Sequence, residues 1–180
     1  MKKLFLVAIV VMLTMPTIVK AQTKEEMQTS QKRVENLQVL LAKYPKQTGL
    51  ADVDAYGQAV YNAAVLAVAN SEQLEGLYYR SIGETKDGVT DVNIKTPTVE
   101  ECLVLATTIT AEGVSVKQAN DLAKAATEQA KSEKNPMKAA KIAKMTQFTT
   151  DVTPLLLEES VAQGKAINEI VETIKSGKNL

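Results

Sequence analysis

Apolar residues recur at intervals of three and four positions along most of the chain, which is the pattern of amphipathic helices. The first such stripe predicts a helix from about Lys24 to Lys43. Pro45 ends this helix, because the residue before a proline is pushed out of the helical region. The apolar side of the helix is formed by Met27, Val34, Leu37, Leu41 and Tyr44.

A second helix is predicted to begin near Asp52. Its segment YNAAVLAVAN, residues 61–70, is apolar nearly all round, which is typical of a central helix. A bend is expected near Asn70, after which helix resumes through SEQLEGLYYRSI. The buried face of the first part consists of Val53, Tyr56, Val60, Ala63, Ala64 and Ala67.

The segment from Gly83 to Pro97 lacks a helical pattern and contains two glycines and two aspartates. It predicts one long irregular loop, in which Val89, Val92 and Ile94 could form a short extended piece. Loops of this length in a small domain are usually functional or disordered.

Helix signals return at Thr98, an N-cap residue with Glu101 three positions on, which is the arrangement of a capping box. This third helix is expected to run to about Glu112 and to stop at Gly113. Ser115 then caps a fourth helix. Its inner face is lined by Val116, Ala119, Leu122, Ala123, Ala126 and Ala130.

The last helical segment runs from Pro136, a residue suited to a first helical position, to about Ser176. Pro154 predicts a kink or a break inside it, because proline removes a backbone hydrogen bond and clashes one turn back. Apolar residues line its inner face on both sides of the proline: Ile142, Met145, Phe148, Val152 and Leu155 before it, and Val161, Ala166, Ile167, Ile170 and Ile174 after it.

These elements predict an all-α fold, an antiparallel bundle of five to six helices joined mostly by short connections. The one long irregular loop lies between the second and third main helices. The chain from residue 22 to residue 180 has the length of a single domain with one core.

The first 21 residues have the three parts of a secretory signal peptide. Lys2 and Lys3 precede an apolar run, and the sequence Val-Lys-Ala ends at Ala21, the expected cleavage point. An uncleaved membrane anchor is the alternative, although the run is shorter than the roughly 20 apolar residues that a spanning helix needs. A lipid anchor would need a cysteine where Ala21 and Gln22 stand.

Cleavage would leave 18 basic and 21 acidic residues, a net charge of −3. A charge so close to zero implies neither nucleic acid nor an anionic membrane as a partner. The expected location is outside the cytoplasm, in a periplasm or the extracellular medium.

The composition excludes several chemistries. The chain has no histidine and a single cysteine, Cys102, so an ordinary zinc site and a Ser-His-Asp or Cys-His nucleophile are ruled out. Cys102 lies beside Leu103 and Leu105 and is expected to be a buried thiol rather than a nucleophile. No cofactor and no metal are expected.

Two segments come close to known ligand motifs and miss them. GETKDGVT, residues 83–90, has the glycine spacing of a phosphate-binding loop but carries Val89 where the lysine belongs. DVDAYG, residues 52–57, opens like a calcium loop, yet its twelfth position is Ala63 instead of glutamate. The expected role of Asp52 or Asp54 is to cap a helix.

Adjacent glutamates recur at 25–26, 100–101 and 158–159. Adjacent helix residues do not face each other, so these pairs predict a solvated helix face rather than a catalytic pair.

Tyr78, Tyr79 and Arg80 are the candidate binding residues, because tyrosine and arginine are favoured at interface hot spots. Adjacent helix side chains point about 100° apart, so at least one of the two rings is expected at the surface. The alternative is that one ring packs inward and the other covers the loop.

These patterns predict an exported, non-catalytic helical bundle that binds or scaffolds a protein or an apolar small molecule in the cell envelope. The alternative is a periplasmic carrier or chaperone that holds an apolar ligand between helices. A third hypothesis is a histidine-free hydrolase or lyase. An exposed apolar groove favours the carrier, a cavity with converging carboxylates favours the enzyme, and a filled core favours the scaffold.

Overall fold

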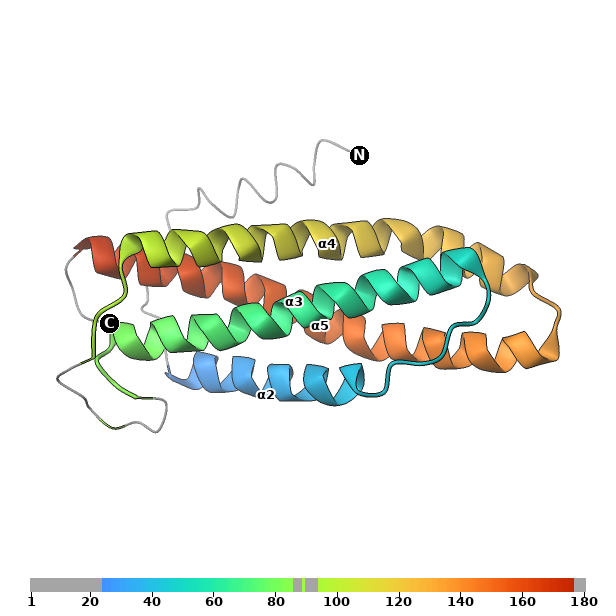
Figure 1. Ribbon diagram of the computed structural model, residues 1–180, viewed down its shortest axis with the longest axis horizontal. Helices are drawn as coiled ribbons and strands as arrows, with labels where there is room; N and C mark the ends of the chain where they lie inside the picture. The colour runs from blue at the N-terminus through green and yellow to red at the C-terminus, as the bar shows by residue number, and fades with distance from the viewer. Residues whose placement is uncertain (1–23, 86–88, 90–93, 177–180) are drawn as a thin grey trace.

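The computed structural model describes residues 24–85, 89 and 94–176, and in them the chain is an all-α bundle (Figure 1). The predicted fold class is confirmed, but the predicted number of five to six helices is wrong. The described residues form four helices: α2 (Lys24–Leu41), α3 (Ala51–Ser81), α4 (Val99–Ser132) and α5 (Pro136–Ser176). The signal-peptide segment lies outside the described residues.

Successive helices run in opposite directions along the bundle (Figure 1). Helix α3 contacts α2, α4 and α5, and α5 likewise contacts the other three helices. Within the described residues α2 and α4 do not touch, so they lie on opposite sides of the α3–α5 pair. Helix α3 is therefore surrounded on three sides, as its nearly continuous apolar sequence indicates.

The helix count falls short because one predicted break does not occur. Gly113 and Ser115 both lie inside α4, which continues to Ser132. The Ser115 hydroxyl donates to the Ala111 carbonyl at 3.1 Å, so its hydrogen bond is made within the helix instead of at a cap. An interior glycine costs about 1 kcal/mol relative to alanine, which the packing of a long helix can offset.

Neither Asn70 nor Pro154 ends a helix. Helix α3 is continuous through Asn70, because the side chains of Asn70 and Ser71 bond to other helices instead of competing with the local backbone. Helix α5 is continuous through Pro154, which lies on the exposed side. A break at Pro154 is therefore wrong, and the alternative of a kink stays a prediction.

The predicted helix starts at Thr98 and Pro136 are confirmed. Thr98 and Glu101 form both hydrogen bonds of the capping box, 3.2 Å from the Glu101 N–H to Thr98 Oγ1 and 2.7 Å from the Thr98 N–H to Glu101 Oε2. Pro136 is the first residue of α5, and the Asn135 side chain accepts from the Met137 N–H at 2.9 Å.

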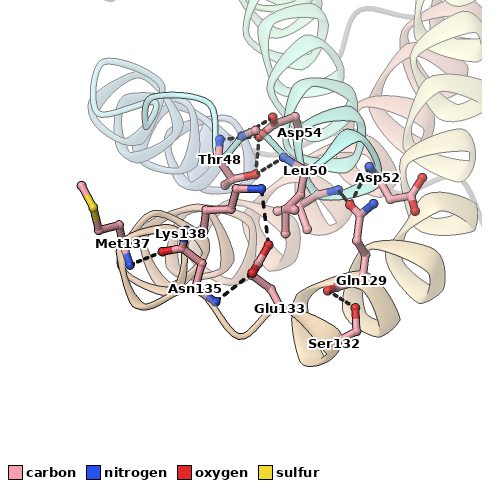
Figure 2. A network of polar contacts seen from close by, with 12 residues as sticks. Thr48, Leu50, Asp52, Asp54, Gln129, Ser132, Glu133, Asn135, Met137 and Lys138 are labelled. Carbon is pink, nitrogen blue, oxygen red and sulfur yellow. Dashed lines mark hydrogen bonds and ion pairs between the residues drawn. The ribbon is translucent and has the colours of Figure 1, made fainter.

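The start of α3 is capped differently from the prediction (Figure 2). The residue before the helix is Leu50, and neither Asp52 nor Asp54 is its cap. The Asp54 carboxylate instead accepts from the backbone N–H groups of Thr48 and Gly49, at 2.7 and 2.9 Å. The backbone N–H of Asp52, in the first turn of the helix, donates to the side-chain oxygen Oε1 of Gln129 on α4 at 2.9 Å. A side chain distant in sequence therefore does the capping, which no local pattern could indicate.

Two apolar clusters fill the bundle, one toward each end. The first includes Met27, Leu74, Tyr78, Cys102 and Ile170, and the second includes Leu37, Val60, Ala64, Phe148 and Leu156. In the second cluster Gly57 allows α3 to approach α5 closely, since a Cβ there would lie 2.3 Å from the sulfur of Met145. Polar residues lie between the clusters.

Candidate functional site

The interior of the bundle contains a group of polar side chains from all four helices, which we call the mid-bundle polar layer. Hydrogen bonds link its members into two adjacent sets, one around Glu159 and one around Glu112, and both of these carboxylates are fully buried. The layer consists of Ser30 and Arg33 on α2, Asn70 and Ser71 on α3, Glu112 on α4 with the exposed Thr108 at its edge, and Glu159, Ser160 and Gln163 on α5.

Glu159 joins three helices. One carboxylate oxygen accepts from the hydroxyls of Ser30 and of Ser71, the latter at 2.6 Å. The other oxygen accepts from Nε of Arg33 at 2.8 Å. The Glu159 side chain is 0% exposed and that of Arg33 is 16% exposed, so this ion pair is largely shielded from water.

Glu112 holds α3, α4 and α5 together through neutral donors. Its carboxylate accepts from Nδ2 of Asn70 at 2.8 Å and from the Ser160 hydroxyl. Burial raises the pKa of Glu112, while the bonds from Ser160 and Asn70 lower it and the charge of Glu159 raises it further. The two buried carboxyls therefore have different environments, one paired with a cation and one held only by neutral groups.

Gln163 completes the layer. Its Nε2 donates to the Ala67 carbonyl at 2.8 Å and to the Ser71 hydroxyl at 2.6 Å, which fixes the orientation of the amide. Its Oε1 is buried and has no hydrogen-bond partner among the described residues.

A pair of carboxyls in contrasting environments is the arrangement that acid–base enzymes use. In such enzymes the pair meets substrate in a cleft, whereas Glu112 and Glu159 are each 0% exposed. Their oxygens are also already occupied by serine, asparagine and arginine donors. The geometry therefore supports a structural role: the layer joins the helices and fixes how they align.

The prediction that the 158–159 glutamates form a solvated face is wrong for Glu159. The inner face of α5 runs through Val152, Leu156, Glu159, Gln163 and Ala166, in steps of three and four residues. The predicted stripe assigned Val161 to this face, but Val161 is 55% exposed. If the apolar stripe through Phe148 and Val152 is continued in the same steps of three and four residues, whether the residues are apolar or polar, it predicts that Glu159 and Gln163 are buried.

The candidate binding residues Tyr78 and Tyr79 are 2% and 9% exposed, so the expectation of a surface ring is wrong. Both rings fit inside because α3 has neighbours on three sides, and they contact each other edge to face at 5.4 Å between centroids. Beside them Cys102 is fully buried as predicted, and burial raises the pKa of its thiol.

Arg80 connects the end of α3 to the start of α4. Its guanidinium binds both carboxylate oxygens of Glu101, at 3.1 and 3.0 Å, and donates to the Lys95 carbonyl at 3.0 Å. The hydrogen bonds from Arg80 lower the pKa of Glu101 to about 2. The hypothesis that Tyr78, Tyr79 and Arg80 contact a partner stays a prediction, and residues 86–88 and 90–93 of the 83–97 loop lie outside the described residues.

A second candidate site lies on the surface between the end of α2 and the first third of α5. We call it the lysine groove, a half-open hollow of about 620 Å³. Its apolar part is formed by Leu40, Pro45 and Phe148, and its polar part by Lys43, Lys46, Lys141, Lys144, Gln147 and Asp151. No local sequence pattern indicates this groove, because its lysines come from two segments about a hundred residues apart.

No protein-family model matches the chain, and comparison with curated proteins and with solved structures finds no match. None of the helices α2 to α5 combines the length and the apolar composition that crossing a membrane requires. In the part of the chain that the structure describes, no three acidic or cysteine side chains come together as metal ligands would.

Proposed function

We propose that this chain is an exported, non-catalytic helical-bundle protein with a binding or scaffolding role in the cell envelope. Export is supported by the charged start, apolar run and small-residue exit of residues 1–21. The absence of histidine removes the commonest general acid and base.

The observation that carries the proposal is the closure of the mid-bundle polar layer. Glu112 and Glu159 are the acidic groups best placed for acid–base chemistry, and both are enclosed by the helices that they join. A substrate could reach them only if the helices separated, which would break the ion pair between Arg33 and Glu159. Binding is therefore assigned to the surface of the bundle.

Exchange of one carboxyl for an amide tests the proposal. In Glu112→Gln the amide oxygen can accept from Asn70 and the amide NH₂ can donate to Ser160, so both contacts survive while the acid is lost. In cells that lack the protein, this variant should restore growth and envelope integrity as well as the wild type does. A variant that folds normally but fails to restore them would show that the carboxyl is needed for chemistry.

Export is tested separately by fractionating the cells and measuring the mass of the intact protein by mass spectrometry. The expected chain begins at Gln22. A chain that retains residues 1–21, or that carries a lipid, would contradict the export part of the proposal.

The carrier hypothesis is a second candidate, and the lysine groove is the observation that favours it. The groove combines an apolar surface with a polar rim, as small-molecule sites commonly do. It lies at the surface beside α5 instead of in the bundle core, where the apolar clusters and the polar layer are placed.

A further inference from the structure

The lysine groove exists because α2 is much shorter than the helices on which it packs. Its 18 residues span about 27 Å, whereas the 41 residues of α5 span about 61 Å. Beyond Leu41 the chain leaves the helix and continues as a non-helical segment toward the start of α3 (Figure 1). This narrower segment covers the face of α5 only in part, and a hollow remains beside Phe148.

Basic residues from both walls face this hollow. Lys141 and Lys144 are one turn apart on α5, and Lys43 and Lys46 lie on the segment after α2. Because α2 and α5 are antiparallel, that segment runs toward the beginning of α5, where the other two lysines lie (Figure 1).

The positive charge of the groove is not neutralised locally. Among the described residues none of the four lysines forms an ion pair, while Lys124, Lys138 and Lys165 elsewhere do. The one acid of the groove, Asp151, accepts a hydrogen bond from Gln147 at 2.7 Å. Four cations against one anion give the groove a charge of +3, although the exported chain as a whole is expected to be slightly acidic.

Between these charges the groove is apolar. Phe148 belongs to the second apolar cluster and is 5% exposed, and Leu40 and Pro45 are half-buried beside it. A ligand that is only an anion would leave this surface unused, and a ligand that is only apolar would leave the lysines without a counter-charge. The volume of about 620 Å³ is that of a small-molecule site.

We propose that the lysine groove binds a small amphiphilic phosphate, a phosphate ester whose apolar chain lies against Leu40, Pro45 and Phe148 while its phosphate lies among the lysines. Lysine ammonium groups are compact point charges, which suit the several oxygens of a phosphate from different directions. The planar two-point recognition of a carboxylate is typically made by arginine, which the groove lacks. This inference rests on the proposed binding function and names its ligand class.

Titration of the full exported chain, purified from the cell envelope, tests the assignment. The probe is octyl phosphate below its micelle concentration, compared with inorganic phosphate and with uncharged octyl glucoside. Lys141→Gln/Lys144→Gln should weaken octyl phosphate binding about tenfold. The matched control Lys117→Gln/Lys124→Gln removes the same charge from exposed positions of α4, which does not touch α2.

The expected result is binding of octyl phosphate that weakens with added salt, is lost in part in the Lys141/Lys144 variant and is unchanged in the control. If inorganic phosphate binds as tightly as octyl phosphate, the assigned contact with the apolar chain is wrong. If octyl glucoside binds as tightly, the assigned contact between phosphate and lysines is wrong. Equal loss in the control would show a general charge effect and overturn the site. If octyl phosphate does not bind at all, the proposed ligand class is wrong. The proposed non-catalytic function is tested independently, and it fails only if Glu112→Gln does not restore growth and envelope integrity.

Discussion

Replacement of Glu159 by glutamine should destabilise the bundle strongly, although it changes one oxygen to an NH₂ group. The remaining amide oxygen can still accept from the hydroxyls of Ser30 and Ser71. The new NH₂ group would face Nε of Arg33, which now donates to the carboxylate at 2.8 Å. Two donors would then oppose each other, and the arginine would lose its counter-charge.

The expected loss in the free energy of unfolding follows from the burial of the partner left behind. Removing one partner of a buried ion pair while the other stays buried costs about 3–5 kcal/mol. Arg33 keeps 16% of its side-chain exposure and can reach water in part, so Glu159→Gln should lie near the lower end, at about 3 kcal/mol. Arg33→Gln should lie higher, at about 4 kcal/mol, because the stranded Glu159 is 0% exposed.

Denaturant unfolding followed by circular dichroism measures these costs, with the slope of the transition checked for constancy. For a chain of this size, a loss of about 3 kcal/mol corresponds to a fall in Tm of about 6–12 °C. The double variant Arg33→Gln/Glu159→Gln removes both charges, and its cost should be smaller than the sum of the single costs by about 2 kcal/mol or more.

Two results would refute this reasoning. One is a cost of Glu159→Gln below about 1 kcal/mol, and the other is additivity of the two exchanges within about 0.5 kcal/mol. The matched control is Glu128→Gln, which breaks an exposed i,i+4 pair with Lys124 at 3.9 Å and should cost no more than about 0.5 kcal/mol.

Four further variants test other parts of the structure. Burial raises the pKa of Glu112, so the folded chain binds its proton more tightly than the unfolded chain, and stability should fall as pH rises above the ordinary value of 4.5. Glu112→Gln removes this fall, and its Tm relative to wild type should rise with pH. Gly57→Ala should lower the free energy of unfolding by about 1–3 kcal/mol, because the added Cβ would collide with Met145. Gly76→Ala should raise it by up to about 1 kcal/mol, because a Cβ there has nothing within 4 Å and alanine favours the helix. Denaturant titrations measure both changes. Tyr79→Ala should cost roughly 3 kcal/mol as a core truncation. A Tyr79→Ala chain that melts like the wild type but loses an envelope partner in a pull-down would instead support the contact hypothesis.

The helical class and most of the core could be predicted because the relevant signals are local. The stripe of α2 placed Met27, Val34 and Leu37 inside, and all three are buried. The capping box of Thr98 and Glu101 also formed as expected, because each partner satisfies a backbone group only three residues away.

The predictions that failed depended on contacts between helices. Asn70, Gly113 and Pro154 are local helix breakers, yet each lies inside a long helix whose neighbours supply the stability. Tyr78 and Tyr79 are both buried because α3 is enclosed on three sides, which its own sequence does not specify.

The candidate sites were missed for a related reason. Glutamate is almost always exposed, so Glu159 was assigned to solvent, and its burial depends on Arg33, a residue 126 positions away. The lysine groove combines Lys43 with Lys144, which have no pattern in common along the chain. Charge that is balanced over the whole sequence can therefore be concentrated at one place on the folded surface.

The polar layer also determines where the lysine groove opens. Arg33 binds Glu159, so α2 is fixed along α5 at that point, and its end at Leu41 lies about 12 Å further on. Phe148 lies about 16 Å from Glu159 in the same direction, since α5 runs antiparallel to α2. Helix α2 therefore ends just short of Phe148, and the hollow begins there. A slip of α2 by one turn, about 5.4 Å, would cover or widen the groove, but it would also leave Glu159 buried without its cation. The buried ion pair thus sets the length of α5 that stays open to a ligand.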